Sequence, residues 1–157
     1  MKLYMSGISK RMIGEIMYEI KRATKDDFES IKSFLLDVPA INVVDEDILN
    51  NASILFNKNI IHGVVSFEVF YNYALIRYFV FKKNVDELLV KELVKSVEES
   101  IKEKEVSYVF SLVNQNDIYD LFTSLGFNEA RKEDVFVEET NFEKSKFKDT
   151  KLMLKRL

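Results

Sequence analysis

The chain has 157 residues, 47% of them hydrophobic, and its formal net charge is −3. This length suits one domain with a sizeable core, and the near balance of charges argues against a nucleic-acid-binding protein, which usually carries a basic excess. The absence of cysteine and the single histidine, His62, exclude disulfides, thiolate metal sites and clusters of histidine ligands. No apolar run approaches the roughly 20 residues that span a bilayer, and no hydrophobic signal core follows Met1, so we expect a cytoplasmic protein.

The first 17 residues mix basic side chains with methionine and isoleucine. We interpret residues 1–17 as an N-terminal extension that is either frayed or docked on the rest of the chain. A basic arm that binds a partner is the alternative. The folded domain is therefore expected to cover residues 18–157.

The domain is predicted to open with a strand and a helix. Alternation of side-chain type over 18–22 is typical of a strand. Thr24 and Asp27 have the spacing of a capping box at the start of a helix. Apolar residues then recur at helical spacing as far as Val38, and Pro39 ends that helix.

A short helix or turn over 45–51, with Asp45 as its cap, leads into three successive strands. We predict these strands over 52–56, 60–70 and 74–81, because β-branched and aromatic residues dominate them and short polar turns separate them. Three strands joined by such short turns imply an antiparallel meander.

Beyond this meander the hydrophobic period becomes helical. We predict a long helix over 85–101, a strand over 106–113 and a shorter helix that begins near Asn116. Gly126 occupies the position where a glycine ends a helix.

The last two strands are expected over 134–139 and 151–157. The element order is therefore β-α-(α)-β-β-β-α-β-α-β-β, an α/β arrangement of the α+β kind. The two strands that flank the long helix should be parallel, and the other pairs should be largely antiparallel.

This order is similar to that of the GNAT N-acyltransferase superfamily, and four stretches resemble its recurring phrases. These stretches are Ile-Lys-Arg-Ala-Thr-Lys-Asp-Asp at 20–27, Asn-Ile-Ile-His-Gly-Val-Val at 59–65, Gln115 to Phe127 with its closing Leu-Gly-Phe, and Met-Leu-Lys-Arg-Leu at 153–157. The resemblance covers residues 18–157. It implies a GNAT-like mixed, mostly antiparallel sheet of about six to seven strands flanked by helices.

The resemblance implies an N-acyltransferase that takes an acetyl or other acyl group from acetyl-CoA or another acyl-CoA. The acceptor would be an amine, on a small molecule, a protein N-terminus or a lysine, and a homodimer stays open. Pantetheine would pair with the backbone of the strand that ends at 81, and a backbone N–H near Val80 and Phe81 would polarise the thioester carbonyl. The residues assigned to the acyl-CoA site are Phe79, Val80, Phe81, Lys82, Lys83, Asn84 and Asn114.

The sequence departs from the family at the loop that holds the pyrophosphate. The family form, Arg/Gln-x-x-Gly-x-Gly/Ala, falls on Val85–Val90, which contains neither glycine nor arginine. We predict that Asn84 and Glu87 form a capping pair and that Asp86 and Glu87 place negative charge where phosphates would bind. Two preceding lysines would offset this charge. We therefore expect CoA binding to be weak or altered.

The residues for proton transfer are also altered. The family often uses a tyrosine in its fourth helix as general acid, and Phe122 occupies that position. Tyr119, one turn earlier, is the nearest substitute, although a packing role for it is favoured. A water relay from Glu68 or Tyr119 is the best available assignment. We favour a structural role for His62 because no acidic partner is evident.

Two other functions stay open. The altered loop and Phe122 favour a non-catalytic GNAT-fold module that binds a partner or a different small ligand. A non-GNAT α+β enzyme, such as a metal-dependent nuclease, would need carboxylates gathered in space. The sequence offers many acidic residues but no recognisable metal-ligand spacing, so we expect no metal site.

Overall fold

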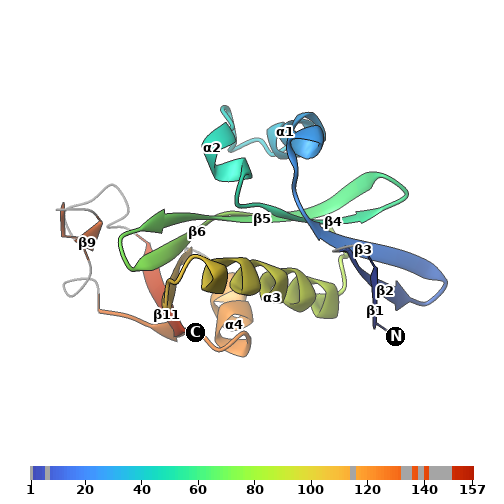
Figure 1. Cartoon of the computed structure of the whole chain (residues 1–157). Coiled ribbons are helices and arrows are strands. Elements are labelled where there is room, and N and C mark those ends of the chain that lie inside the picture. Colours follow the sequence, from blue (N-terminus) through green and yellow to red (C-terminus); the bar gives the residue numbers. More distant parts are fainter. Residues whose placement is uncertain (1, 6–7, 114–115, 132–135, 138–139, 142–149) are drawn as a thin grey trace. The chain divides into compact units, whose positions relative to one another are not determined.

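The computed structural model describes residues 2–5, 8–113, 116–131, 136–137, 140–141 and 150–157 (Figure 1). The chain divides into two compact units. The first comprises Met1–Phe67 and Arg77–Ser100, and the second comprises Glu68–Ile76 and Ile101–Leu157. The chain passes from one unit to the other within two long strands and near the end of a long helix, and each unit is described separately below.

Among the described residues, nine strands are hydrogen-bonded in the order β1-β2-β3-β4-β5-β6-β7-β11-β8, and β9 and β10 form a separate pair. Their bounds are β1 Lys2–Met5, β2 Ile8–Ile13, β3 Ile16–Arg22, β4 Ser53–Asn57, β5 Ile60–Phe70, β6 Tyr73–Phe81, β7 Tyr108–Val113, β8 Asn128–Glu129, β9 Phe136–Val137, β10 Thr140–Asn141 and β11 Lys151–Arg156. The helices are α1 Phe28–Leu36, α2 Glu46–Leu49, α3 Glu87–Glu103 and α4 Asn116–Ser124, with a 3₁₀ turn, η1, at Lys25–Asp27.

The structure confirms the local signals that predicted the first two helices. The Asp27 carboxylate accepts hydrogen bonds from the Thr24 N–H at 2.8 Å and the Thr24 hydroxyl at 3.2 Å. These bonds cap the N-terminus of η1. Asp45 caps α2, because its carboxylate accepts from the Asp47 N–H at 3.0 Å. Lys32 of α1 forms an ion pair with Glu46, which joins the two helices.

The first unit has helices on both faces of its strands (Figure 1). On one face, α1 and α2 pack on β4 and β5 through a buried apolar cluster that contains Ile31, Leu35, Leu49, Ala52, Ile54, Ile61 and Val64. On the other face lies α3, where the Ser96 hydroxyl is 3.3 Å from that of Ser53 in β4. Both sides of these strands are therefore buried, which accounts for their nearly continuous apolar sequence.

The residues expected as an N-terminal extension contain two strands that precede β3. β2 pairs with β3 in an antiparallel hairpin whose turn includes Gly14, at φ 63°. Lys10 and Glu19 form an ion pair across this hairpin at 3.4 Å, and Arg11 reaches Glu92 of α3 at 3.9 Å. This segment belongs to the same compact unit as residues 18–67, and a separate role for residues 1–17 stays a prediction.

The second unit is built on the antiparallel pair of β7 and β11. Their register runs from Tyr108 opposite Arg156 to Val113 opposite Lys151. The short strand β8 pairs with the other edge of β11. Tyr73, at the start of β6, packs edge-on against Phe110 with ring centroids 5.0 Å apart.

The parallel pair predicted around the long helix is confirmed, because β6 and β7 run parallel. The sheet is larger than the expected six to seven strands. β1 and β2 extend it at one edge, and the two-residue strand β8 is too short to give an alternating signal. Of the strand predicted over 134–139, residues 136–137 form β9, and the remainder lies outside the described residues.

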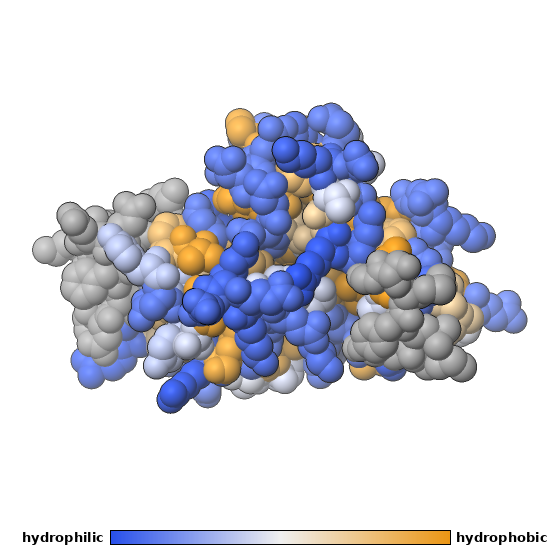
Figure 2. Space-filling model, viewed as in Figure 1, coloured by the Kyte–Doolittle hydropathy of each residue, from blue (hydrophilic) through white to orange (hydrophobic). Residues whose placement is uncertain are grey.

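The surface seen in Figure 2 is mostly hydrophilic, with smaller apolar areas between the charged side chains. The large hydrophobic residues at the surface include Val43, Ile60, Ile16 and Leu36. Scattered apolar residues of this kind are normal on soluble domains. Within the described part of the chain, no helix combines the length and apolar character that a membrane span requires.

Candidate functional site

The strand β6 continues well past its pairing with β7. The parallel register joins Tyr73 to Tyr108, Ala74 to Val109 and Leu75 to Phe110, and it ends there, although β6 runs on to Phe81. In the described strands the ladder therefore covers only the first third of β6. The GNAT resemblance predicts such an early end of pairing, because pantetheine pairs with the strand that continues.

Hydrogen bonds to β5 show which backbone groups of β6 point toward that strand. The Tyr78 N–H donates to the Ser66 hydroxyl at 3.2 Å, and the Lys82 N–H donates to the His62 carbonyl at 2.9 Å. Backbone groups of successive strand residues point in opposite directions. The backbone of Phe79 and Phe81 is therefore directed to the edge of β6 opposite β5.

Gly63 allows an aromatic ring to lie directly on the β5 backbone. A Cβ built at Gly63 would stand 2.5 Å from Cδ1 of Phe81 and 2.7 Å from its Cε1. The Phe81 ring also packs edge-on against Phe79, with centroids 5.1 Å apart. The glycine at this place in the GNAT phrase thus has a packing reason in this chain. Two of the residues assigned to the acyl-CoA site, Phe79 and Phe81, form an aromatic pair beside it.

The N-terminus of α3 is capped by Asp86, and the predicted Asn84–Glu87 capping pair is wrong. The Asp86 Oδ1 accepts from the Leu88 N–H at 2.8 Å, and the Asp86 carbonyl accepts from the N–H groups of Leu89 at 2.9 Å and Val90 at 3.2 Å. The true cap lies two residues after Asn84, because Asn84 has a left-handed backbone at φ 66° that turns the chain before the helix.

Two acidic residues stand at this helix end, and two basic residues stand on the loop before it. Asp86 and Glu87 stand at the start of α3, and Glu87 pairs with Lys91 one turn later at 3.5 Å. Lys82 and Lys83 are exposed on the preceding loop. Carboxylates at this end interact favourably with the helix dipole, so the sequence stabilises the helix without any bound anion.

His62 lies where β5 bulges. The register places Ile61 opposite Phe56 and Gly63 opposite Leu55, which leaves His62 as the extra residue. Its ring packs edge-on against Tyr18 at 5.5 Å. Burial lowers the His62 pKa below its ordinary value, and the positive charge of Lys82 lowers it further. These contacts support the structural role expected for this histidine.

The two catalytic candidates lie on different elements of the second unit. The Tyr119 hydroxyl on α4 donates to Oε2 of Glu129 at 3.4 Å, and the Lys151 ammonium lies 4.9 Å from the centroid of its ring. Glu68 lies on β5 and is partly buried. Asn114, assigned to the acyl-CoA site, lies outside the described residues. The catalytic assignment of Glu68 and Tyr119 stays a prediction.

Phe122, which the GNAT resemblance aligns with a general acid, is a core residue. It is 1% exposed and packs edge-on against Phe127 with ring centroids 5.0 Å apart. The N–H of Phe127 donates to the Phe122 carbonyl at 3.0 Å, and the N–H of Gly126 donates to the Thr123 carbonyl at 3.0 Å. This is a Schellman motif with its expected apolar contact, and Gly126 has the required left-handed φ of 95°.

Tyr78 is a polar group on β6 that the sequence analysis did not assign to a site. Its hydroxyl accepts a hydrogen bond from the Asp45 N–H at 3.0 Å, which fixes the residue that caps α2. The period-2 alternation of strands places Tyr78 on the opposite face from Phe79 and Phe81. That alternation was the available signal for separating it from the other aromatics.

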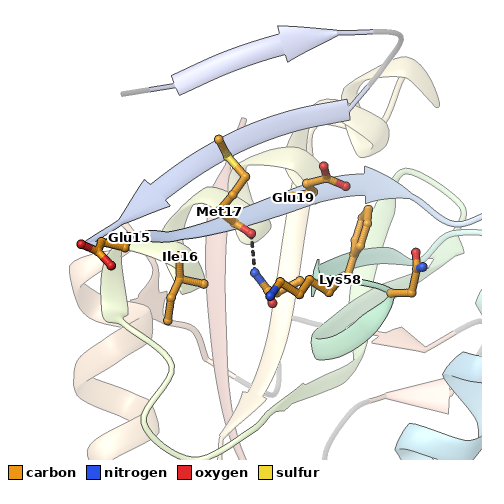
Figure 3. A pocket seen from close by; sticks show the side chains of 8 residues that line it. Glu15, Ile16, Met17, Glu19 and Lys58 are labelled. Carbon is orange, nitrogen blue, oxygen red and sulfur yellow. Dashed lines mark hydrogen bonds between the residues drawn. The ribbon is translucent and has the colours of Figure 1, made fainter.

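A pocket of about 610 Å³ lies at one end of the first unit, between β3 and the β4–β5 turn (Figure 3). It is lined by Glu15, Ile16, Met17, Glu19, Phe56, Asn57, Lys58 and Asn59. The Asn57 amide donates to the Met17 carbonyl at 2.6 Å and holds the two sides together. None of the residues assigned to acyl-CoA or to catalysis lines this pocket.

The described residues contain no group of three or more His, Cys, Asp or Glu side chains arranged to hold a metal ion. A comparison with protein-family models gives no match, and a comparison with curated proteins gives none either.

Solved structures do match the chain. N-acetylglutamate synthase from Neisseria gonorrhoeae, in complex with coenzyme A and N-acetyl-glutamate, matches 89% of this chain and 35% of its own with a TM-score of 0.71 and 19% identity. The ribosomal-protein-S18-alanine N-acetyltransferase of Escherichia coli matches over 89% and 94% of the two chains, with a TM-score of 0.65 and 15% identity. A GNAT-family acetyltransferase of Staphylococcus aureus matches over 89% and 99%, with a TM-score of 0.68 and 15% identity.

These likenesses differ in extent but agree in fold. The chain spans about a third of the length of the synthase and nearly the whole length of the other two proteins. Together with the early end of the β6–β7 ladder and the Leu-Gly-Phe helix end, they establish the architecture. The chain has the fold of the GNAT acetyltransferases.

Proposed function

We infer that this protein is an N-acyltransferase that moves an acyl group from an acyl-CoA thioester to an amine. The observation that carries this proposal is the early end of the β6–β7 ladder at Leu75 and Phe110, after which β6 continues to Phe81. The matching synthase is a complex with coenzyme A, and the matching bacterial enzyme is named for acetylation of an alanine. Both lend support to a thioester donor and an amine acceptor.

The donor is proposed to lie along the outer edge of β6. Pantetheine has two amide groups, which can pair with strand backbone as a further strand would. The edge of β6 opposite β5 presents backbone groups of Phe79 and Phe81. We place the acyl-CoA pantetheine here, along the stretch from Phe79 to Phe81, in which the backbone groups of Val80 point to β5 and those of its two neighbours point outward.

The chemistry proposed is direct attack of a neutral amine on the thioester carbonyl. The new C–N bond forms as the C–S bond breaks, and the thiolate that leaves takes up a proton. A backbone N–H on the β6 edge, near Val80 and Phe81, would donate to the carbonyl oxygen as negative charge develops there. Proton transfer is assigned to water relayed by Glu68 or Tyr119.

The proposal is tested by titrating the protein with acetyl-CoA in a thermal-unfolding experiment. A ligand at 100 times its Kd should stabilise the fold by about 2.7 kcal/mol. ATP, which carries phosphates but no pantetheine, is the matched control and should give a smaller shift. Thiol release on adding a panel of amino acids, polyamines and peptides then identifies the acceptor. Absence of a shift at millimolar acetyl-CoA would contradict the proposal.

A second function, a non-catalytic module with the same fold, is favoured by one observation. Asp86 closes the N-terminus of α3 with its own side chain, and Phe122, where the resemblance implies a general acid, is a buried ring without a proton to donate. Such a module would bind a partner or small ligand without thiol release. The thiol-release assay separates the two functions, because only the enzyme releases thiol when an amine is present.

A further inference from the structure

The phosphate-binding end of a donor site is the part that fits this chain poorly. In the loop form that the resemblance leads one to expect, free N–H groups at the start of a helix hold the pyrophosphate. Here the N–H of Leu88 is taken by the Asp86 side chain, and those of Leu89 and Val90 are taken by the Asp86 carbonyl. The Val90 bond is the first regular i→i−4 bond of the helix, so the donors that this helix end satisfies itself before any ligand arrives are those of Leu88 and Leu89.

Charge at the same place opposes a second anion. The Asp86 carboxylate lies within hydrogen-bond distance of the Leu88 N–H, which is where a phosphate oxygen would otherwise lie. Two anions at one helix end repel each other, and the repulsion increases as water is excluded. Lys82 and Lys83 carry opposite charge, but both side chains are exposed, so solvent and salt screen their attraction.

The backbone is also less accessible than in a glycine-rich loop. Every residue of Val85–Val90 carries a Cβ, whereas glycine permits close approach of a phosphate to the main chain. The left-handed turn in this loop is made by Asn84, at φ 66°. The turn is therefore preserved without the bare backbone that would cradle a diphosphate.

The pantetheine end, by contrast, fits the chain. The outer edge of β6 supplies main-chain donors and acceptors in an extended strand. Pairing through the backbone does not depend on side-chain identity, so the altered loop leaves this interaction intact.

We propose that the protein recognises its donor as an acyl-pantetheine thioester and that the nucleotide diphosphate adds little to the affinity. This inference rests on the proposed function and narrows its substrate class. Acyl-pantetheine occurs both in coenzyme A and as the phosphopantetheine arm of carrier proteins. The shared thioester arm is the group that the chain binds, and the source is distinguished by experiment.

The test compares three donors by calorimetry on the full chain: acetyl-CoA, S-acetyl-4′-phosphopantetheine and S-acetyl-pantetheine. We expect the Kd values of the three donors to lie within about tenfold of one another. A preference for acetyl-CoA greater than this overturns the inference and leaves the acyltransferase proposal standing. Failure of all three donors to bind overturns the acyltransferase proposal itself.

A pair of variants tests the role assigned to Asp86. Asp86→Ser removes the charge and keeps an N-cap oxygen, so the helix should remain folded. We expect acetyl-CoA to bind about two- to fivefold more tightly to this variant, with the affinity for S-acetyl-pantetheine unchanged. Glu87→Gln removes the same charge one residue later, from a carboxylate already paired with Lys91 at 3.5 Å, and should change less.

The outcomes of the variant test are decisive in both directions. A selective gain for acetyl-CoA in Asp86→Ser supports the inference, and equal effects on acetyl-CoA and S-acetyl-pantetheine contradict it. Circular dichroism of each variant verifies that α3 is intact. A carrier protein loaded with S-acetyl-phosphopantetheine then identifies the source: tighter binding than the free arm points to the carrier, and equal binding points to coenzyme A.

Discussion

Two helix ends in this protein correspond to recurring GNAT phrases, and they differ in what has been kept. The C-terminus of α4 keeps its Leu-Gly-Phe sequence and forms a Schellman motif, with Phe122 and Phe127 in contact and Gly126 at φ 95°. The N-terminus of α3 has no glycine over 85–90 and is capped by Asp86. The first end packs the core of its unit, and the second would meet a ligand.

The difference shows how a fold and its ligand site can separate in one sequence. Every helix leaves unpaired backbone groups at each end. At α4 the motif that pairs them also buries two aromatic rings, so changing it would damage the core. At α3 the N–H groups can be paired by a ligand or by the chain itself, and Asp86 pairs them without a ligand. The fold is thus insensitive to the change that, in our proposal, alters donor binding.

The largest effect is expected from removing the buried ring at the end of α4. Phe122→Ala should lower the free energy of unfolding by about 3–5 kcal/mol, because it leaves a cavity beside Phe127 in a site that is 1% exposed. Urea denaturation measures the loss. Val43→Ala, at a residue 81% exposed, is the control and should change stability by less than about 0.5 kcal/mol. Similar losses in both variants would contradict the core role of Phe122.

A smaller effect is expected at the glycine of the same helix end. Gly126→Ala should cost about 1–2 kcal/mol, because a Cβ is strained at a φ of 95°. The new Cβ would also lie 3.4 Å from Cε of Lys155. Gly126→Asn should cost less than the alanine variant, since asparagine tolerates the left-handed region. If alanine and asparagine have equal effects in urea denaturation, the conformational explanation is wrong.

Most of the element order could be predicted because it depends on local signals. The capping box of Thr24 and Asp27, the cap at Asp45 and the glycine after α4 each involve neighbouring residues. The period of the hydrophobic residues, also a local signal, predicted β5 and α3. The predicted strand and helix bounds therefore differ from those observed mostly at element ends, where fraying blurs the boundary.

The candidate site was predicted less completely because its features depend on contacts between distant residues. The ring of Phe81 on Gly63 and the hydrogen bond from Asp45 to Tyr78 join separate elements, and neither leaves a local pattern. At α3, Asn84 and Asp86 both had the chemistry of a cap. The left-handed backbone of Asn84 decided between them, and the sequence does not show which residue adopts it.

The start of α3 should respond to loss of its cap by about 1 kcal/mol. Asp86→Ala removes the oxygen that accepts from the Leu88 N–H, and such losses typically cost 0.5–2 kcal/mol, or about 1 kcal/mol. Asp86→Asn keeps an oxygen at the same place and should retain most of the stability. Thermal unfolding of both variants makes the measurement. An equal loss in the two variants would mean that charge, and not the hydrogen bond, stabilises this helix end.

The smallest effect is expected at His62, whose pKa is lowered by burial and by the charge of Lys82 in the loop before α3. Burial and the Lys82 ammonium hold the His62 pKa below its ordinary value of 6.5. The unfolded chain therefore binds a proton more readily than the folded chain, and stability should fall as the pH drops below about 6.5. His62 is the only histidine, so His62→Gln should flatten this part of the pH profile. Lys82→Met should reduce the slope without removing it, because burial remains. If the wild type and His62→Gln lose stability in parallel between neutral pH and the onset of carboxylate titration, then neither burial nor Lys82 perturbs this group.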